Sequence, residues 1–356
     1  MYKKRWEQIQ IDLKKEKVDA FVSVSEGNNR YLCCAHIPSF PLVTHVIIPK
    51  KGEPIAIASS LEQFRAADEC AISNIKIFTP HPYIKRNGKT GLSILKRELK
   101  KLNAKNVLFD SKINGIRGKV KNLVEKHRMV KTGPELSAMR EAARLTDNAA
   151  KVLENEIIAP GKTERQVALE LDNVLRSNKN VQAVSFETII ASGAHAAYSH
   201  HDNTNSKLRD GDLVICDFGV FVDGYCSDLT RTFPVGRISN ELENIYNIVY
   251  EAQQKAIKSV KPGKPYSVVD TAAREVIKEH GYAKYFVHSL GHGLGLEVHE
   301  AVAGINVGSK TKMQKNHTFT IEPGIYVPRI GGARIEDDVL VTESGVELLT
   351  KYPRKL

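Results

Sequence analysis

The chain has 356 residues, of which 42% are apolar and 26% charged, and it carries a formal net charge of +11. This length corresponds to about two domains of roughly 150 residues and allows a core that needs no disulfide or structural metal. The composition excludes a disordered chain, and no apolar run approaches the roughly 18 residues of a membrane span. The charged N-terminus lacks the apolar stretch of a signal peptide, and the five cysteines show no CxxC spacing, so we expect reduced thiols in a cytoplasmic protein.

The positive charge is concentrated in the first part of the chain. Residues 1–131 have a net charge of +14, whereas residues 132–356 have a net charge of −3. A basic segment can bind nucleic acid, but no helix-turn-helix, RNP or zinc-finger pattern accompanies this charge. We therefore expect the basic residues, such as Lys96 and Lys100, to lie on solvated helix faces, and we expect no nucleic-acid partner.

Helix and strand signals alternate in the first part of the chain and predict an α/β domain of about 125 residues. Helices are expected at 3–17, 61–70, 92–102 and 116–126, and strands at 19–24, 45–49, 54–58, 74–78 and 106–109. The first helix places Trp6, Ile9 and Leu13 on one face, as expected for a helix that packs on a core.

The segment Val130–Pro134 is expected to separate two domains, because its Gly-Pro pair breaks regular structure and proline suits the first turn of a helix. We therefore assign residues 1–128 to the first domain and residues 129–356 to the second. In the second domain we expect helices at 135–156, 163–176, 241–259 and 267–279, and strands at 186–191, 213–222, 225–233, 319–322 and 334–342. Thr163 and Gln166 have the spacing of a capping box.

Two carboxylates lie on apolar strands that a tight turn joins. Asp217 lies within Leu-Val-Ile-Cys-Asp-Phe, Asp228 lies within Tyr-Cys-Ser-Asp-Leu-Thr, and Asp223-Gly224 between them is a strong hairpin signal. This turn pairs Asp228 with Gly219 and places Asp217 two residues along on the same face. The carboxylates are then diagonal neighbours, about 7–8 Å apart at the backbone. If they are buried they need a hard cation between them; the alternative is a solvent-facing hairpin with two unrelated aspartates.

Three further residues complete a set of potential metal ligands. His292 is flanked by glycines that allow close approach of the backbone, Glu322 ends an apolar strand before Pro-Gly, and Glu336 precedes another apolar run. Oxygen ligands with a single histidine favour a hard or borderline ion such as Mn²⁺, Co²⁺ or Fe²⁺ over a structural zinc.

The segment around His292 also carries a resemblance to a known family. His288–Glu300, with the sequence His-Ser-Leu-Gly-His-Gly-Leu-Gly-Leu-Glu-Val-His-Glu, resembles the signature of the proline-specific pita-bread metallopeptidases. Asn29-Arg-Tyr-Leu32 is similar to the N-terminal domain of prolidases and creatinase. The resemblance covers essentially the whole chain. It implies an α/β (α+β) fold, with a creatinase/prolidase-like N-terminal domain followed by a C-terminal pita-bread catalytic domain.

The resemblance implies roles for the five candidate ligands. Asp217 and Asp228 match the aspartate pair of the family, and His292 matches its single histidine. Glu322 and Glu336 match its two glutamates. Two divalent metal ions are implied, with Asp228 and Glu336 in contact with both. Asp217 would bind one ion, and His292 with Glu322 the other. Mn²⁺ or Co²⁺ is favoured, with Zn²⁺ or Fe²⁺ as alternatives.

Further residues are implied to act on the substrate. His200 matches a family histidine that we expect to hold the substrate carboxylate, and His299 matches one that polarises the scissile carbonyl. Glu322 is expected to carry a proton from water to the leaving nitrogen. Arg334 matches a family arginine near the site, with a structural ion pair as its alternative. A satisfied core histidine is the alternative for His299, and for His201 we expect a histidine on a surface loop.

Together these matches imply a dinuclear metallopeptidase that hydrolyses the Xaa-Pro bond of peptides with proline at the second position. We expect a prolidase that acts on Xaa-Pro dipeptides. An aminopeptidase P that removes the first residue of longer peptides is one alternative, and a non-catalytic binding protein with the same fold is another. The resemblance also implies a homodimer.

Overall fold

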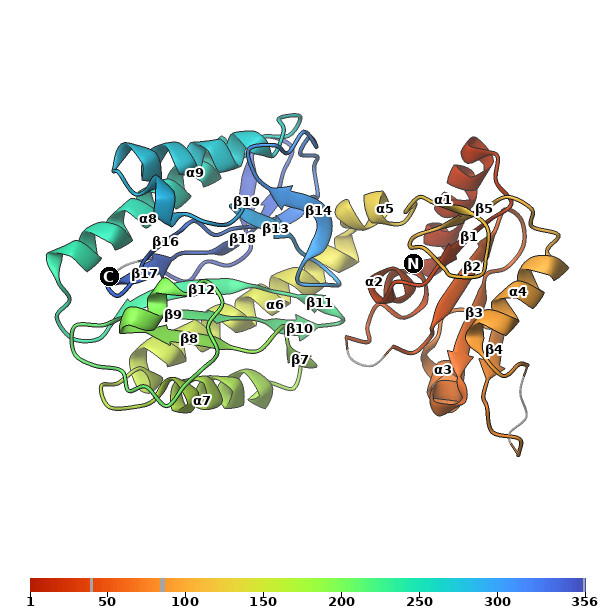
Figure 1. Ribbon diagram of the computed structural model, residues 1–356, viewed down its shortest axis with the longest axis horizontal. Helices are drawn as coiled ribbons and strands as arrows, with labels where there is room; N and C mark the ends of the chain where they lie inside the picture. The colour runs from red at the N-terminus through yellow and green to blue at the C-terminus, as the bar shows by residue number, and fades with distance from the viewer. Residues whose placement is uncertain (39–40, 84–86, 355) are drawn as a thin grey trace. The chain divides into compact units, whose positions relative to one another are not determined.

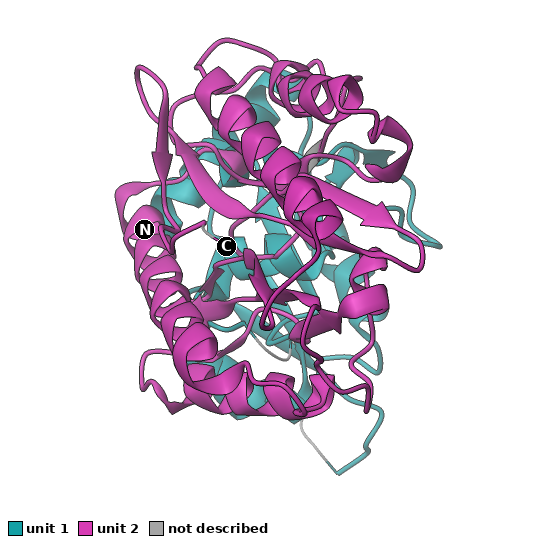
Figure 2. Ribbon diagram, turned by 90° about the vertical axis from the view of Figure 1, so that its left-hand side faces the viewer, with its two compact units in different colours: residues 1–128 teal, residues 129–356 magenta. Residues whose placement is uncertain are grey.

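The structure is a computed structural model that describes residues 1–38, 41–83, 87–354 and 356. The chain divides into two compact units, Met1–Arg128 and Met129–Leu356 (Figure 2). Each unit has its own sheets and its own buried apolar cluster. Within the described residues, no helix combines the length and the apolar character that a bilayer crossing requires.

The first unit is built on a six-stranded mixed sheet with the order β4-β3-β2-β1-β5-β6. Its strands are β1 (Ala20–Ser23), β2 (His45–Pro49), β3 (Ile55–Ser59), β4 (Ile75–Phe78), β5 (Val107–Phe109) and β6 (Lys119–Val120). Its helices are α1 (Tyr2–Glu16), α2 (Glu26–Asn29), α3 (Gln63–Glu69), α4 (Gly91–Lys101) and α5 (Glu125–Met129), with short helical turns η1 (Arg30–Cys34) and η2 (Ser60–Glu62). β2 runs antiparallel to both of its neighbours, and the remaining pairs are parallel.

Both faces of this sheet are covered. Leu95 and Leu99 lie one helical turn apart on α4 and pack in one apolar cluster with Val22 and Ile57. The neighbouring strand residues, such as Phe21, point to the other face and are equally buried. The central strands β1, β2, β3 and β5 are therefore nearly continuous buried runs rather than alternating ones.

The helix predicted at 116–126 is wrong. This segment contains the short strand β6, which runs parallel to β5 with Lys119 opposite Leu108, and α5 starts only at Glu125. A Cβ atom at Gly118 would lie 2.1 Å from the Phe109 ring, so the chain passes against β5 more closely than a helix allows. The apolar spacing of the segment fits a helix, and this close approach overrides it.

Among its described residues, the second unit contains four sheets and four long helices. Figure 1 shows how these elements are arranged. The helices are α6 (Gly133–Val152), which continues as the π-helical turn η3 (Leu153–Ile157), α7 (Glu164–Ser177), α8 (Asn240–Ser259) and α9 (Ser267–Glu279), with short turns η4 (Gly193–Ala197) and η5 (Ala283–Tyr285). The strands of the first half are β7 (Ala183–Val184), β8 (Ile189–Ser192), β9 (Leu213–Phe218), β10 (Val220–Val222), β11 (Tyr225–Cys226) and β12 (Leu229–Pro234). Those of the second half are β13 (Gly291–Gly293), β14 (Glu300–Ile305), β15 (Thr318–Ile321), β16 (Gly324–Val327), β17 (Gly331–Arg334), β18 (Asp337–Val341) and β19 (Val346–Leu348).

Each half of this unit places a helix pair on its strands. α6 and α7 share an apolar cluster with β8, β9, β10 and β12, while α8 and α9 share another with β14–β18 (Figure 1). The predicted capping box starts α7, where the Gln166 N–H donates to Thr163 Oγ1 and the Thr163 N–H donates to Gln166 Oε1. The two halves meet at β12 and β17, where the Thr232 hydroxyl donates to the Arg334 carbonyl at 2.8 Å.

Strands predicted as continuous are interrupted at three positions, and two of them carry candidate ligands. The predicted strand 334–342 is wrong as one piece, because β17 ends at Arg334 and β18 begins at Asp337, which leaves Glu336 in the gap. The predicted strand 225–233 is likewise split into β11 and β12, with Asp228 in the gap. A Cβ atom at Gly219 would lie 1.9 Å from the Ser227 carbonyl oxygen, and this close crossing separates β9 from β10.

Candidate metal centre

The two aspartates lie on the hairpin that the Asp223-Gly224 turn closes. Both turn residues have positive φ, 47° and 82°, which matches the right-handed twist of the joined strands. β9 and β12 pair antiparallel with Asp217 opposite Thr230. Asp228 precedes Thr230 by two residues, so it points to the same face and is a diagonal neighbour of Asp217. The predicted pairing register is therefore confirmed.

The other three candidate ligands converge on this hairpin from separate elements. His292 lies on β13, Glu322 follows β15 directly, and Glu336 lies between β17 and β18. His292 Nε2 lies 3.3 Å from Glu322 Oε1 and 3.7 Å from Asp228 Oδ2. One potential ligand atom from each of Asp228, His292 and Glu336 lies within 4.8 Å of the others.

Hydroxyl groups hold the two glutamates in place. Thr230 donates to Glu336 Oε2 at 2.6 Å, and Thr320 donates to Glu322 Oε1 at 3.0 Å. Sequence reasoning missed both threonines, although each lies two residues from a candidate ligand, on the same side of its strand. Because side chains two residues apart on a strand share a face, this spacing could have predicted that both threonines contact the ligand set.

His292 is oriented as a neutral imidazole. Its Nδ1 lies 3.2 Å from the Gly293 carbonyl, so Nδ1–H donates there and the Nε2 lone pair faces the carboxylates. Burial lowers the pKa of His292, which favours this neutral form. A neutral imidazole held by a backbone carbonyl is the usual state of a histidine that binds a metal.

The carboxylates of the cluster are buried close together, which disfavours their ionised forms when no cation is bound. Burial, reinforced by the Glu336 and Asp217 charges, raises the pKa of Asp228 well above its usual range. Burial and the Glu322 charge do the same for the pKa of Glu336, and burial raises the pKa of Glu322 to about 7. Among the described residues, Asp217 Oδ1 and Asp228 Oδ1 are buried and have no hydrogen-bond partner. Buried carboxylate oxygens without a donor are suited to bind divalent cations, so the residues present fit a metal centre.

All eight residues singled out in the sequence line one pocket of about 950 Å³. They are His200, Asp217, Asp228, His292, His299, Glu322, Arg334 and Glu336. His200 and His299 are exposed, so the core-histidine alternative for His299 is wrong. The His299 ring lies against His292, with centroids 4.1 Å apart.

Arg334 lines the pocket and also forms an ion pair. Its Nη2 lies 2.7 Å from Asp217 Oδ2, and its Nη1 donates to the Tyr326 hydroxyl at 3.1 Å. Tyr326 in turn lies 2.8 Å from His288 Nε2. Burial lowers the pKa of His288 to about 4, so this histidine is neutral at physiological pH. Tyr326 and His288 are pocket residues to which the sequence analysis assigned no role.

The prediction that His201 is a surface histidine is wrong. Its side chain is 6% exposed, and Nε2 lies 2.8 Å from Glu164 Oε2. Glu164, at the first turn of α7, also contacts His195 and accepts hydrogen bonds from Ser192 and Thr204. Against the effect of burial, these hydrogen bonds lower the pKa of Glu164 to about 2, so it is a fully satisfied buried carboxylate.

Comparisons with known proteins identify the family of the chain and similar folds. Residues 137–343 match the metallopeptidase family M24. The Xaa-Pro dipeptidase of Pyrococcus furiosus is 42% identical over 238 residues, which are 67% of this chain and 68% of that protein. The solved structure of a Xaa-Pro dipeptidase from Bacillus anthracis aligns with a TM-score of 0.88 and 32% identity, over 100% of this chain and 99% of the other. An X-Pro aminopeptidase from Thermotoga maritima aligns with a TM-score of 0.80 and 29% identity, over 95% of this chain and 97% of the other.

Proposed function

The chain belongs to metallopeptidase family M24, and from this premise we propose that it hydrolyses Xaa-Pro bonds, with Xaa-Pro dipeptides as its substrates. The observation that carries the proposal is the convergence of five potential ligands in one pocket, with two buried carboxylate oxygens that have no donor among the described residues. The dipeptidase and aminopeptidase relatives described above support a substrate with proline after the scissile bond.

We assign the metal to the same five residues. Asp217, Asp228, Glu322 and Glu336 would supply carboxylate oxygens, and His292 would supply Nε2. We propose two divalent ions, Mn²⁺ or Co²⁺, for this oxygen-rich set. Bound there, such ions polarise a peptide carbonyl and make water a stronger acid.

The remaining chemistry is carried by side chains of the pocket. The contacts of Glu322 with His292 and Thr320 both use Oε1, so we assign proton transfer to Oε2, which takes the proton from water and gives it to the leaving nitrogen. His299 donates to the scissile carbonyl oxygen as negative charge develops on it. His200, at the exposed rim, binds the substrate carboxylate, and Arg334 holds Asp217 in place.

The site can select proline on the leaving side of the scissile bond because the proline nitrogen carries no hydrogen-bond donor. The imide nitrogen of an Xaa-Pro bond has no N–H, so the site needs no acceptor for one. An ordinary peptide bond is a secondary amide whose N–H needs an acceptor in the same place, and an N–H left desolvated without one would disfavour ordinary dipeptides.

The test uses full-length protein stripped of metal, to which Mn²⁺, Co²⁺ and Zn²⁺ are added separately. A Xaa-Pro dipeptide, the matched Xaa-Ala dipeptide and a Xaa-Pro-containing tripeptide are offered to each form. We expect hydrolysis to return only with metal and to be fastest with the Xaa-Pro dipeptide. Efficient cleavage of the tripeptide alone would replace the proposal by an aminopeptidase P activity. If metal binds and none of the three peptides is cleaved, the protein is not a peptidase of this specificity.

A further inference from the structure

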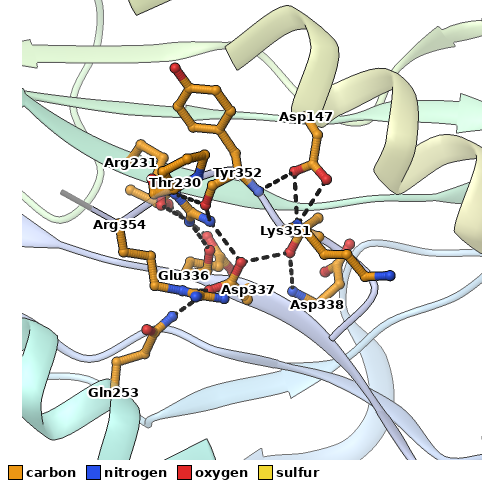
Figure 3. Close-up of polar contacts among 12 residues, drawn as sticks. Asp147, Thr230, Arg231, Gln253, Glu336, Asp337, Asp338, Lys351, Tyr352 and Arg354 are labelled. Carbon is orange, nitrogen blue, oxygen red and sulfur yellow. Dashed lines mark hydrogen bonds and ion pairs between the residues drawn. The ribbon is translucent and has the colours of Figure 1, made fainter. Parts of the chain in front are cut away.

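A buried arginine, Arg231, contacts Thr230, Glu336 and Asp337 (Figure 3). Arg231 is 1% exposed and follows Thr230 on β12, so its side chain leaves the strand on the face opposite to the pocket. Its Nη1 donates to the carbonyl oxygens of Thr230 at 2.9 Å and Glu336 at 2.6 Å. Its Nη2 donates to Asp337 Oδ1 at 2.8 Å and to the Tyr352 carbonyl at 2.6 Å.

These contacts matter because Glu336 lies outside the sheet ladder. It stands in the gap between β17 and β18, so it is not part of the register in which either strand pairs with its neighbour. Its N–H donates to the Thr230 carbonyl at 3.1 Å, its carboxylate accepts from the Thr230 hydroxyl at 2.6 Å, and its carbonyl accepts from Arg231. Two consecutive residues of β12 therefore hold Glu336: Thr230 binds its N–H and its carboxylate, and Arg231 binds its carbonyl.

The guanidinium of Arg231 is paired with the carboxylate of Asp337, which also accepts hydrogen bonds from other side chains. Asp337 is fully buried and accepts hydrogen bonds from Gln253 Nε2 and Arg354 Nε, both at 2.6 Å, as well as from Arg231. The Thr350 hydroxyl donates to the same carboxylate at 2.9 Å. A charge pair in this environment has one arrangement, because any other leaves a buried donor or charge without its partner.

The segment that supplies the Tyr352 carbonyl is also anchored. Asp147 on α6 accepts the backbone N–H groups of Lys351 and Tyr352, with distances of 2.8 Å and 2.9 Å (Figure 3). The backbone of this segment is therefore fixed on both sides, by α6 and by the guanidinium.

We propose that Arg231 is a positioning residue for Glu336: its planar guanidinium fixes the Glu336 backbone so that the carboxylate enters the pocket in the orientation that metal binding needs. This inference rests on the proposed metal centre. A lysine at this position keeps the charge but is a single-point donor, and it cannot reach two backbone carbonyls and the Asp337 carboxylate at once.

The experiment compares full-length wild type with Arg231→Lys. Each protein is stripped of metal, and the Kd for Mn²⁺ is measured by calorimetry, with thermal unfolding recorded with and without Mn²⁺. We expect the Kd for Mn²⁺ to rise about 10- to 100-fold in Arg231→Lys, as for the loss of other groups that orient metal ligands. Arg144→Lys is the matched control, because Arg144 makes an exposed two-point pair with Glu141 on α6, and its Kd should equal that of wild type.

A purely structural role predicts a different pattern. Arg231→Lys would then unfold at a lower temperature with and without Mn²⁺ by equal amounts, with an unchanged Kd, and that result overturns the inference. If Arg231→Lys does not fold, Arg354→Gln is measured instead, since it removes one contact to Asp337 and leaves Arg231 in place. Its Kd should rise by about two- to tenfold, and an unchanged value is again contradictory. Wild type that binds Mn²⁺ but cleaves no Xaa-Pro peptide would refute the proposed function alone.

Discussion

Replacing Asp228 by asparagine should make the metal-free protein more stable while it abolishes activity. Asp228 is 4% exposed, and a potential ligand atom of it lies within 4.8 Å of one on Glu336. Two unit charges at 4.8 Å repel by about 3.5 kcal/mol at an effective dielectric constant of about 20. Protons shared within the cluster relieve part of this repulsion, so we expect Asp228→Asn to raise the free energy of unfolding of the metal-free form by about 1–2 kcal/mol. The unfolding midpoint should then rise by about 2–8 °C.

The same substitution removes one of the proposed ligands and should abolish the stabilisation by metal. In wild type, we expect Mn²⁺ to raise the unfolding temperature, because an ion that binds the folded state alone stabilises it. In Asp228→Asn this increase should be absent, bound Mn²⁺ should fall, and Xaa-Pro hydrolysis should drop by about 1,000-fold or more.

The assay is thermal unfolding of chelator-treated protein with and without Mn²⁺, together with metal analysis and peptide hydrolysis. Asp223→Asn is the matched control, because Asp223 is exposed in the turn of the same hairpin and asparagine tolerates its positive φ. The control should behave as wild type. A metal-free Asp228→Asn that is less stable than metal-free wild type would refute the electrostatic reasoning, and normal turnover with full metal content would refute the ligand assignment.

Three other predictions concern the same unit. As the pH rises from 4.5 to about 7, metal-free wild type should lose free energy of unfolding relative to metal-free Glu322→Gln, because the folded state favours the protonated form of Glu322; identical pH profiles of the two proteins in urea unfolding contradict this. Glu164→Ala should cost about 3–5 kcal/mol, since it leaves two histidines and several buried donors without their acceptor, and a loss below about 1 kcal/mol in the same assay would show that the carboxylate is dispensable. Arg334→Lys should lower kcat/KM by about 10- to 100-fold at full Mn²⁺ content, because lysine cannot serve Asp217 and Tyr326 together; unchanged kinetics would leave Arg334 without a positioning role.

Turn and strand rules that act over short sequence separations were sufficient to predict how the two aspartates are arranged. One turn dipeptide and the two-residue period of strands predicted that Asp217 and Asp228 are diagonal neighbours, and the observed register agrees. The predicted family and fold class are confirmed by the match of residues 137–343 to family M24 and by the TM-score of 0.88 over the whole chain. These features depend on short sequence separations or on motifs that a family shares.

The predictions that were wrong concern features that depend on contacts between segments far apart in the sequence. His201 looks like a loop histidine, and only the fold brings Glu164 to it. The apolar spacing of residues 116–126 suits a helix, but the close approach of Gly118 to Phe109 selects a strand. The interruption of a predicted strand at Glu336 has the same origin, since the residue is held by β12 and not by its neighbours in sequence.

Three consecutive acids, Glu336, Asp337 and Asp338, have three different destinations. The first enters the pocket, the second meets Arg231, and the third accepts the backbone N–H of Asp228 at 2.9 Å. Inserting or deleting one residue here would therefore misdirect all three carboxylates at once. Arg231 would lose its buried partner, and the pocket would lose the carboxylate of Glu336. Side-chain changes can separate stability from activity in this stretch, but length changes cannot, so homologous chains should vary in loop length elsewhere and keep this junction at constant length.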